Sequence, residues 1–221
     1  MRTFSRRLFI ASGMALATII GRPVAARDAT SGVSVRQAME RRRSSRLYAS
    51  DPIAEAMLLD LLFAANGVNR PDIDGRTAPS WHGAKDVDIY VATADGVSLF
   101  DPIAHALVQV IDQDIRGQTS PEPFVGTAPA VLIYVSDQSK LSAAAASFEM
   151  GQSREVVERQ HEIAAYVDTA VVAQNVYLYC AAEGLGTCLV GGSDPAAINL
   201  ALALRPEQRV TYVQPVGHPA A

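Results

Sequence analysis

Four arginines gather in the stretch RRRSSR at residues 41–46, beside two serines, in a chain of net charge -4. Guanidinium groups and a serine hydroxyl suit a phosphate, because they donate hydrogen bonds to its oxygens. On an extended segment alternate side chains point the same way, so Arg42, Ser44 and Arg46 would share one face. We therefore expect a phosphate-bearing ligand at this cluster.

The alternative is that these arginines only end a helix. Residues 33–42 place apolar side chains on one helical face, and cations near a helix C-terminus interact favourably with its dipole. Two or three cations are enough for that role, and the cluster holds four. The phosphate interpretation is the one we favour.

A second candidate is the stretch GLGTCLVGG at residues 184–192. It does not match the dinucleotide-binding fingerprint, because the third glycine is missing at position 189 and a predicted helix precedes it. Gly191 and Gly192 come just before a helix that Asp194 would cap.

Other chemistry finds little support. No Walker loop and no G-x-S-x-G motif is present, and the four histidines lie far apart, so we expect no metal site. Cys180 and Cys188 lie in apolar sequence, which favours buried thiols over a disulfide framework. The net charge of -4 and the lack of any other basic cluster exclude a nucleic-acid surface.

The first 26 residues predict a signal peptide. Arg6 and Arg7 precede an apolar run that ends at Ile20, and small residues lead up to a cleavage site after Ala26. The run is short for a membrane-anchored helix, which is the alternative. SRRLFI resembles the twin-arginine export signal, which implies the twin-arginine export machinery as a partner and a periplasmic protein. Removing residues 1–26 takes away four arginines and no acid, so the charge falls from -4 to -8.

Residues 27–32 are predicted to form a linker, and residues 33–221 one domain. Apolar residues make up 49% of the whole chain, which is enough to form a buried core. Helices are expected at residues 33–42, 50–67, 103–115, 139–182 with a break near Gly151, and 194–204. In the second of these, Ser50 or Asp51 would be the cap, Pro52 would lie in the first turn, and Gly67 would end the helix.

Strands are expected at both sides of the Asp95-Gly96 turn within residues 87–102, at 128–137 and at 209–218, with a short strand or turn at 187–192. The continuous apolar run at 128–137 is typical of a central strand. The loop at 67–85 is too long for a simple connection, so it is functional or disordered. Interleaved helices and strands predict an α+β domain in two or three layers.

These motifs together resemble the nitroreductase-like flavoproteins over residues 33–219. On that resemblance, Arg42, Arg43, Ser44 and Arg46 hold the ribityl phosphate and ring edge of FMN, and Tyr48 packs behind them. The backbone N–H groups of Gly191 and Gly192 approach the flavin. RTAPS in the long loop is similar to the branch with thiazoline and oxazoline dehydrogenases, where Pro79 and Ser80 lie along the cofactor.

The resemblance implies a nitroreductase-like fold, with a central, mostly antiparallel sheet flanked by helices, and a homodimer with FMN at the subunit interface. The helix within residues 167–186 would supply that interface. A small-molecule substrate would exchange a hydride or electrons with the flavin, and no protein acid or base is needed for this step. Arg46 would stabilise charge at flavin N1 and O2, and Gly191 or Gly192 would donate to N5.

Two other functions remain open for a chain with this resemblance. It could be a relative that modifies the flavin or a peptide, or a binding protein that has lost the cofactor. The chain also lacks the Lys or Arg that family members carry shortly after the GHP stretch, here residues 217–219. Arg41 or Arg70 would then have to take its place.

Overall fold

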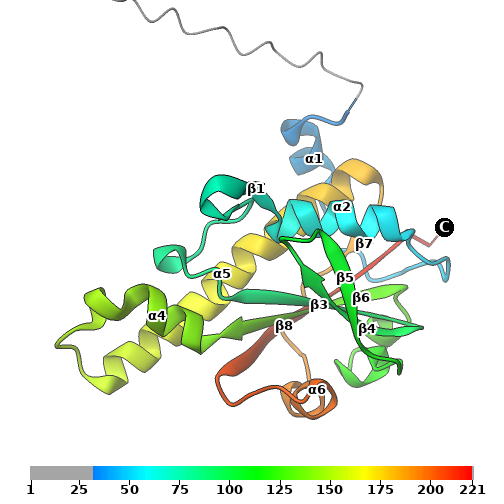
Figure 1. Cartoon of the computed structure of the whole chain (residues 1–221). Helices are drawn as coiled ribbons and strands as arrows, with labels where there is room; N and C mark the ends of the chain where they lie inside the picture. The colour runs from blue at the N-terminus through cyan, green and yellow to red at the C-terminus, as the bar shows by residue number, and fades with distance from the viewer. Residues whose placement is uncertain (1–31, 221) are drawn as a thin grey trace, which may run out of the picture. The chain divides into compact units, whose positions relative to one another are not determined.

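The computed structural model describes residues 32–220, in which helices and strands interleave along the chain (Figure 1). The predicted signal peptide and all but the last residue of the predicted linker lie outside the described residues. The helices are α1 (Val35–Arg41), α2 (Glu55–Asn66), α3 (Pro123–Gly126), α4 (Gln138–Glu149), α5 (Arg154–Glu183) and α6 (Pro195–Leu202). The strands are β1 (Val68–Arg70), β2 (Gly75–Arg76), β3 (Val87–Thr93), β4 (Gly96–Asp101), β5 (Ala106–Ile111), β6 (Ala130–Asp137), β7 (Gly186–Thr187) and β8 (Gln208–Gly217).

The main sheet has six strands in the order β5-β4-β3-β6-β8-β7, and every pair in it is antiparallel. Helices α2 and α5 pack on one face, and α6 lies on the other (Figure 1). The predicted α+β class and antiparallel sheet are confirmed. No helix in the described part of the chain is long and apolar enough to cross a membrane.

The central strands β3 and β6 are buried on both faces because their side chains alternate between two cores. Ile89 and Leu132 pack with α2 and α5, while Tyr90 and Ile133 pack with α6 on the opposite face. The apolar run at residues 128–137 thus becomes a central strand, as its sequence predicts. Burial on both sides makes these two strands the rigid support of the domain.

Residues 103–115 form mainly a strand where the sequence predicts a helix. β5 pairs antiparallel with β4 at the edge of the sheet. Val108 and Val110 are about half exposed and would give a helix no core to pack against. Their branched Cβ atoms instead favour the extended backbone that β4 completes with hydrogen bonds. The prediction failed because tertiary pairing outweighs the local apolar spacing.

Helix α2 starts at Glu55, later than the sequence predicts. Its N-cap residue is Ala54, which makes no side-chain capping bond, so neither Ser50 nor Asp51 caps it and Pro52 precedes its first turn. The end at Gly67 is confirmed.

The other predicted helix limits agree with the structure. α4 and α5 are separated around Gly151, which has a φ of +84°. Asp194 caps α6, because its side chain accepts a hydrogen bond from the Ala197 N–H at 3.0 Å. Both limits are set by local chemistry, a left-handed glycine and a short polar cap, which explains why sequence alone locates them.

Gly96 opens β4 with a φ of +130°, and a Cβ atom there would collide with the carbonyl oxygen of Ile111. We expect Gly96→Ala to lower the free energy of unfolding by about 2 kcal/mol or more, from backbone strain plus the collision. Gly83→Ala is the matched control, because Gly83 has a φ of +71° but open space around a Cβ. Denaturant unfolding measures both, and an equal loss in the two variants would contradict the role of the β4–β5 contact.

Candidate functional site

Tyr177 on α5 brings two predicted site segments together. Its hydroxyl lies 3.0 Å from Ser44 Oγ and accepts a hydrogen bond from the Leu189 N–H at 2.8 Å. The guanidinium of Arg42 lies over the Tyr177 ring, 5.3 Å from its centroid. The arginine cluster and the turn that leads to Gly191 are therefore held by one aromatic residue.

A second link lies further along both segments. Arg46 extends over the ring of Phe124, 6.0 Å from its centroid. Four residues before Phe124 in the chain, Ser120 donates a hydrogen bond to the Gly192 carbonyl oxygen at 2.6 Å. The segment with Arg42, Ser44 and Arg46 and the turn with the glycines thus share two sets of neighbours.

The positive charge of this cluster is not neutralised by protein groups. Within residues 32–220, none of the arginines in the cluster forms a salt bridge with Asp or Glu. Arg43 donates from Nε to the Arg41 carbonyl oxygen at 3.2 Å, which leaves its other N–H groups available. Ser44 and Arg46 are exposed and Arg42 is half-buried. Such a group of cations suits an anionic ligand.

The odd-numbered residues of the arginine cluster face a separate cavity. Arg41, Arg43 and Ser45 line a cavity of about 320 Å³ at the C-terminal end of α5, together with Cys180. Arg42 and Ser44 instead meet at Tyr177. The alternation expected from sequence is therefore present, although Tyr177 also lines the cavity that Arg43 faces.

Gly191 and Gly192 are exposed, and neither has a positive φ. A Cβ on Gly192 would have no atom within 4 Å, and one on Gly191 would only touch Tyr212 at 3.6 Å. Among the described residues, no acceptor bonds to either amide N–H. The glycines are thus not required by the turn itself, and they present two free donors beside open space.

Pro79 and Ser80 lie apart from these residues within the chain. Ser80 Oγ accepts from the Lys85 N–H at 2.8 Å, and the next residue, Trp81, donates its N–H to Asp168 on α5 at 2.8 Å. Asp168 and Tyr177 are nine residues apart on one helix, which corresponds to roughly 13 Å along its axis. One chain therefore forms two separate groups of predicted site residues.

Tyr48 lies behind the cluster, as the resemblance implies. Its hydroxyl donates to the Ser45 carbonyl oxygen at 2.5 Å, and burial raises the pKa of this phenol. The backbone of Tyr48 also forms an isolated antiparallel β-bridge with Pro219 near the C-terminus. Arg70, a suggested substitute for the missing C-terminal cation, donates to the Arg76 carbonyl oxygen on the β1–β2 hairpin. Of the two substitutes, Arg41 is the one that lies in the cluster.

The sequence also predicts buried thiols at the two cysteines and no metal site. Cys180 and Cys188 are both buried and free, and burial raises the pKa of the Cys180 thiol. No group of three or more His, Cys, Asp or Glu side chains among residues 32–220 is placed to hold a metal ion. The thiols are therefore part of the core.

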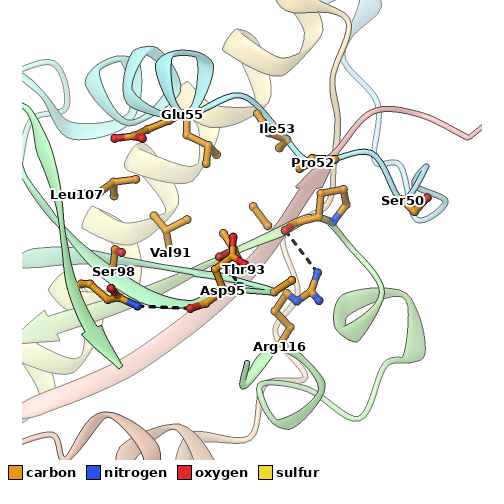
Figure 2. Close-up of a pocket in the computed structure, with 15 residues that line it drawn as sticks. Ser50, Pro52, Ile53, Glu55, Val91, Thr93, Asp95, Ser98, Leu107 and Arg116 are labelled. Carbon is orange, nitrogen blue, oxygen red and sulfur yellow. Dashed lines mark hydrogen bonds between the residues drawn. The ribbon is translucent and has the colours of Figure 1, made fainter. Parts of the chain in front are cut away.

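Figure 2 shows a cavity of about 420 Å³ between the start of α2 and strands β3 to β5. No predicted site residue lines it. Arg116, its only Lys or Arg, pairs with Asp114 at 2.8 Å and donates to the Ala128 carbonyl oxygen at 2.7 Å. Because that charge is already compensated, the cavity is a poor site for a phosphate.

Two buried carboxyl groups, which sequence reasoning missed, lie under the Trp81 segment. Asp86 precedes β3 and is 0% exposed, and Asp168 on α5 is 4% exposed. Ser136 donates to Asp86 Oδ2 at 2.5 Å, and Asp86 Oδ1 is buried without a hydrogen-bond partner among the described residues. Burial is the main reason why the pKa of Asp86 rises to about 7, and the Asp168 carboxylate adds to the shift. Asp86 therefore binds a proton as the pH falls through about 7.

This pair makes stability depend on pH. The pKa of Asp86 is about 7 in the folded protein and about 3.9 in an unfolded chain. The proton stabilises the fold fully below pH about 4, and this contribution is lost as the pH rises through 7. From pH 5 to pH 8 we expect a loss of up to about 3 kcal/mol, which Asp86→Asn should abolish because the amide mimics the neutral acid.

Thermal unfolding across that pH range measures the effect. Asp74→Asn is the control, because the hydrogen bond from Lys85 lowers the pKa of Asp74 and removes it from this titration range. An unchanged slope in Asp86→Asn would show that Asp86 does not titrate in this range.

Three comparisons with known proteins agree with one another. The family model "Nitroreductase family" matches residues 39–218. A protein of Methanocaldococcus jannaschii that carries a nitroreductase name is 31% identical over 170 residues, which are 72% of this chain and 79% of that protein. A crystal structure from Ralstonia eutropha, also named for the nitroreductases, has a TM-score of 0.76 at 31% identity and covers 88% of this chain and 87% of its own.

A more distant structure shows the fold alone. The NADPH:FMN oxidoreductase from Vibrio harveyi, complexed with NAD+, has a TM-score of 0.58 at 17% identity. It covers 85% of this chain and 69% of its own. The helices and the antiparallel sheet of this chain therefore adopt the fold of the nitroreductases. Because the family model matches most of the sequence, the chain belongs to the nitroreductase family.

Proposed function

We propose that this protein is an FMN-dependent oxidoreductase that transfers a hydride or electrons between the flavin and a small organic substrate. One observation carries the proposal: within residues 32–220, arginines that form no ion pair with Asp or Glu share neighbours with two glycine N–H groups that have no acceptor. FMN carries a phosphate for the first group and ring acceptors for the second. Membership of a family of oxidoreductases supports the same chemistry.

The residues present suit the cofactor. Arg42 and Ser44, both at Tyr177, would bind the phosphate and the ring edge, and Arg46 would stabilise negative charge near N1 and O2. Arg43 would contribute less, since its Nε already donates to the Arg41 carbonyl oxygen. When bound, FMN supplies the hydride and electron chemistry, and the chain's own role is to bind and orient it.

The glycines would fix the ring. The free N–H groups of Gly191 and Gly192 would donate to N5 and O4, and the open space beside them would leave room for the ring. The carbonyl of Gly192 is already held by Ser120, which orients the turn. This arrangement favours binding through backbone groups, which no side-chain motif reveals.

A second copy of the chain would complete the site. Pro79 and Ser80 lie with Asp168 rather than with Tyr177 in one chain, so a partner subunit would deliver them to the cofactor. The resemblance places the interface on helix α5, which runs from Arg154 to Glu183. We therefore include a homodimer in the proposal, and RTAPS supports the thiazoline and oxazoline dehydrogenase branch.

Export to the periplasm by the twin-arginine route is also part of the proposal. It rests on the sequence of residues 1–26 alone. A cofactor bound before export would suit that route, because it carries folded proteins.

Replacing Arg42 or Arg46 by alanine tests the cofactor site. Each change should weaken FMN binding by about 2 kcal/mol, or roughly 30-fold in Kd, because a charge-assisted contact is lost. Arg43→Ala should have a smaller effect. Titration of flavin-free protein with FMN, followed by flavin fluorescence, gives the three dissociation constants.

Arg36→Ala is the matched control for this series. Arg36 lies on α1 within ten residues of the cluster, is exposed, and pairs only with Glu40 at 3.6 Å. It should bind FMN like the parent protein. Unchanged affinity in both Arg42→Ala and Arg46→Ala would mean that the cluster only ends a helix.

Gly192→Val tests the backbone donors. A Cβ atom at this position has no protein atom within 4 Å and the φ angle is not positive, so the melting temperature should stay within about 2 °C of the parent. Flavin content per chain should nevertheless fall at least fivefold, because the valine occupies the space beside the N–H group. Absorbance of the purified protein and thermal unfolding together measure both quantities.

Gly192→Ala serves as the graded companion and should lose less flavin than the valine variant. Full flavin content with normal reduction kinetics in both variants would remove this turn from the site. A fall in melting temperature with full flavin content would show a purely structural glycine.

A further inference from the structure

A cavity of about 380 Å³ is lined by residues of α4, of the Trp81 segment and of the N-terminal half of α5, away from Tyr177. Its volume is in the range of small-molecule sites. Its lining is mostly apolar and aromatic: Trp81, Phe148, Gln160, Ile163, Ala164, Val167 and Asp168. Neither the arginine cluster nor the glycine turn contributes to it.

Asp168 is the only ionisable side chain in this lining, and no Lys or Arg accompanies it. Burial raises the pKa of Asp168, while the hydrogen bond that its Oδ2 accepts from the Trp81 N–H at 2.8 Å favours the charged form. The cavity therefore presents a carboxyl group to its contents, and its lining holds no Lys or Arg to pair with that group.

Aromatic rings surround the same space. Trp81 and Phe148 meet edge to face with ring centroids 6.0 Å apart, and His82 packs on Phe148 at 4.9 Å. The faces of such rings attract cations and pack well against flat apolar groups. Charge and lining thus select the same kind of ligand, an organic cation with an aromatic or apolar body.

A second acceptor lies at the far end of the cavity. Gln160 Oε1 is buried and has no hydrogen-bond donor among the described residues. Gln160 and Asp168 are eight residues apart on α5, or roughly 12 Å along the helix. An elongated ligand with a donor at each end would form hydrogen bonds with both acceptors. A buried acceptor that has no donor costs free energy, so such a ligand would remove this cost.

We propose that this cavity binds a small aromatic amine, with its ammonium group at Asp168, its ring beside Trp81 and Phe148, and a second donor at Gln160. As a binding site the cavity is independent of the flavin. As the substrate site of the enzyme it rests on the proposed function, in which the Pro79–Ser80 segment next to Trp81 approaches the cofactor of a partner subunit.

Isothermal titration calorimetry on the full chain tests the proposal with three probes of similar size: tyramine, 2-phenylethylamine and neutral 2-phenylethanol. The two amines should bind at least tenfold more tightly than the alcohol. Tyramine should bind most tightly, because its hydroxyl supplies the second donor. Equal affinity for the amines and the alcohol would overturn the proposal.

Three variants separate the contributions. Asp168→Asn should remove the preference for amines, while Glu162→Gln should keep it, because Glu162 lies on the same helix but pairs with Arg209 outside the cavity. Phe148→Ala, at a half-exposed position, should weaken all three probes together and keep the amine preference. This last variant gives a readout even if Asp168→Asn does not fold.

Two further results distinguish this proposal from occupation of the cavity by a second copy of the chain and from failure of the proposed function. If no probe binds and Phe148→Ala changes the oligomeric state, a second copy of the chain fills the cavity and the proposal fails. Flavin absorbance is recorded on the same samples. Flavin-loaded protein without amine preference contradicts the cavity alone, whereas amine binding by protein that never takes up FMN contradicts the proposed function alone.

Discussion

Burial of one face of α5 against the sheet is the constraint on which both candidate sites depend. Val172, Ala173 and Val176 have almost no exposed surface and pack in the core with α2 and the central strands. Burial of each of the two valine side chains contributes about 1.5–3 kcal/mol relative to exposure. The buried face fixes the rotation of the helix, so the positions of Tyr177 and Asp168 follow from core packing.

Polar contacts inside the core then fix the helix along its axis. Thr169 meets Thr211 of β8 with 2.9 Å between their hydroxyl oxygens, and Gln214 of β8 donates from Nε2 to the Ala173 carbonyl oxygen of α5 at 3.5 Å. Apolar packing tolerates small sliding, whereas buried hydrogen bonds do not. Because α5 is held in this way, it can present an aromatic hydroxyl to the cofactor segments at one end and an acidic cavity at the other.

Sequence patterns predicted the parts of the fold that local chemistry decides. The apolar run of β6, the Asp194 cap and the interruption at Gly151 all depend on residues close in the chain. β5 could not be found in this way, because its strand form depends on pairing with β4, and the start of α2 depends on where Ile53 is buried. The motif residues of the site were readable, but their neighbours Tyr177, Phe124 and Asp168 were not, since long-range packing brings them there.

The central claim is that the uncompensated arginines and free glycine N–H groups together bind FMN. The most direct measurement is the titration of flavin-free full-length chain with FMN, followed by the absorption bands of the bound flavin and by the mass of the complex. The account predicts saturation at one FMN per chain in a dimeric complex. Folded protein that takes up no FMN at any concentration tested would contradict it.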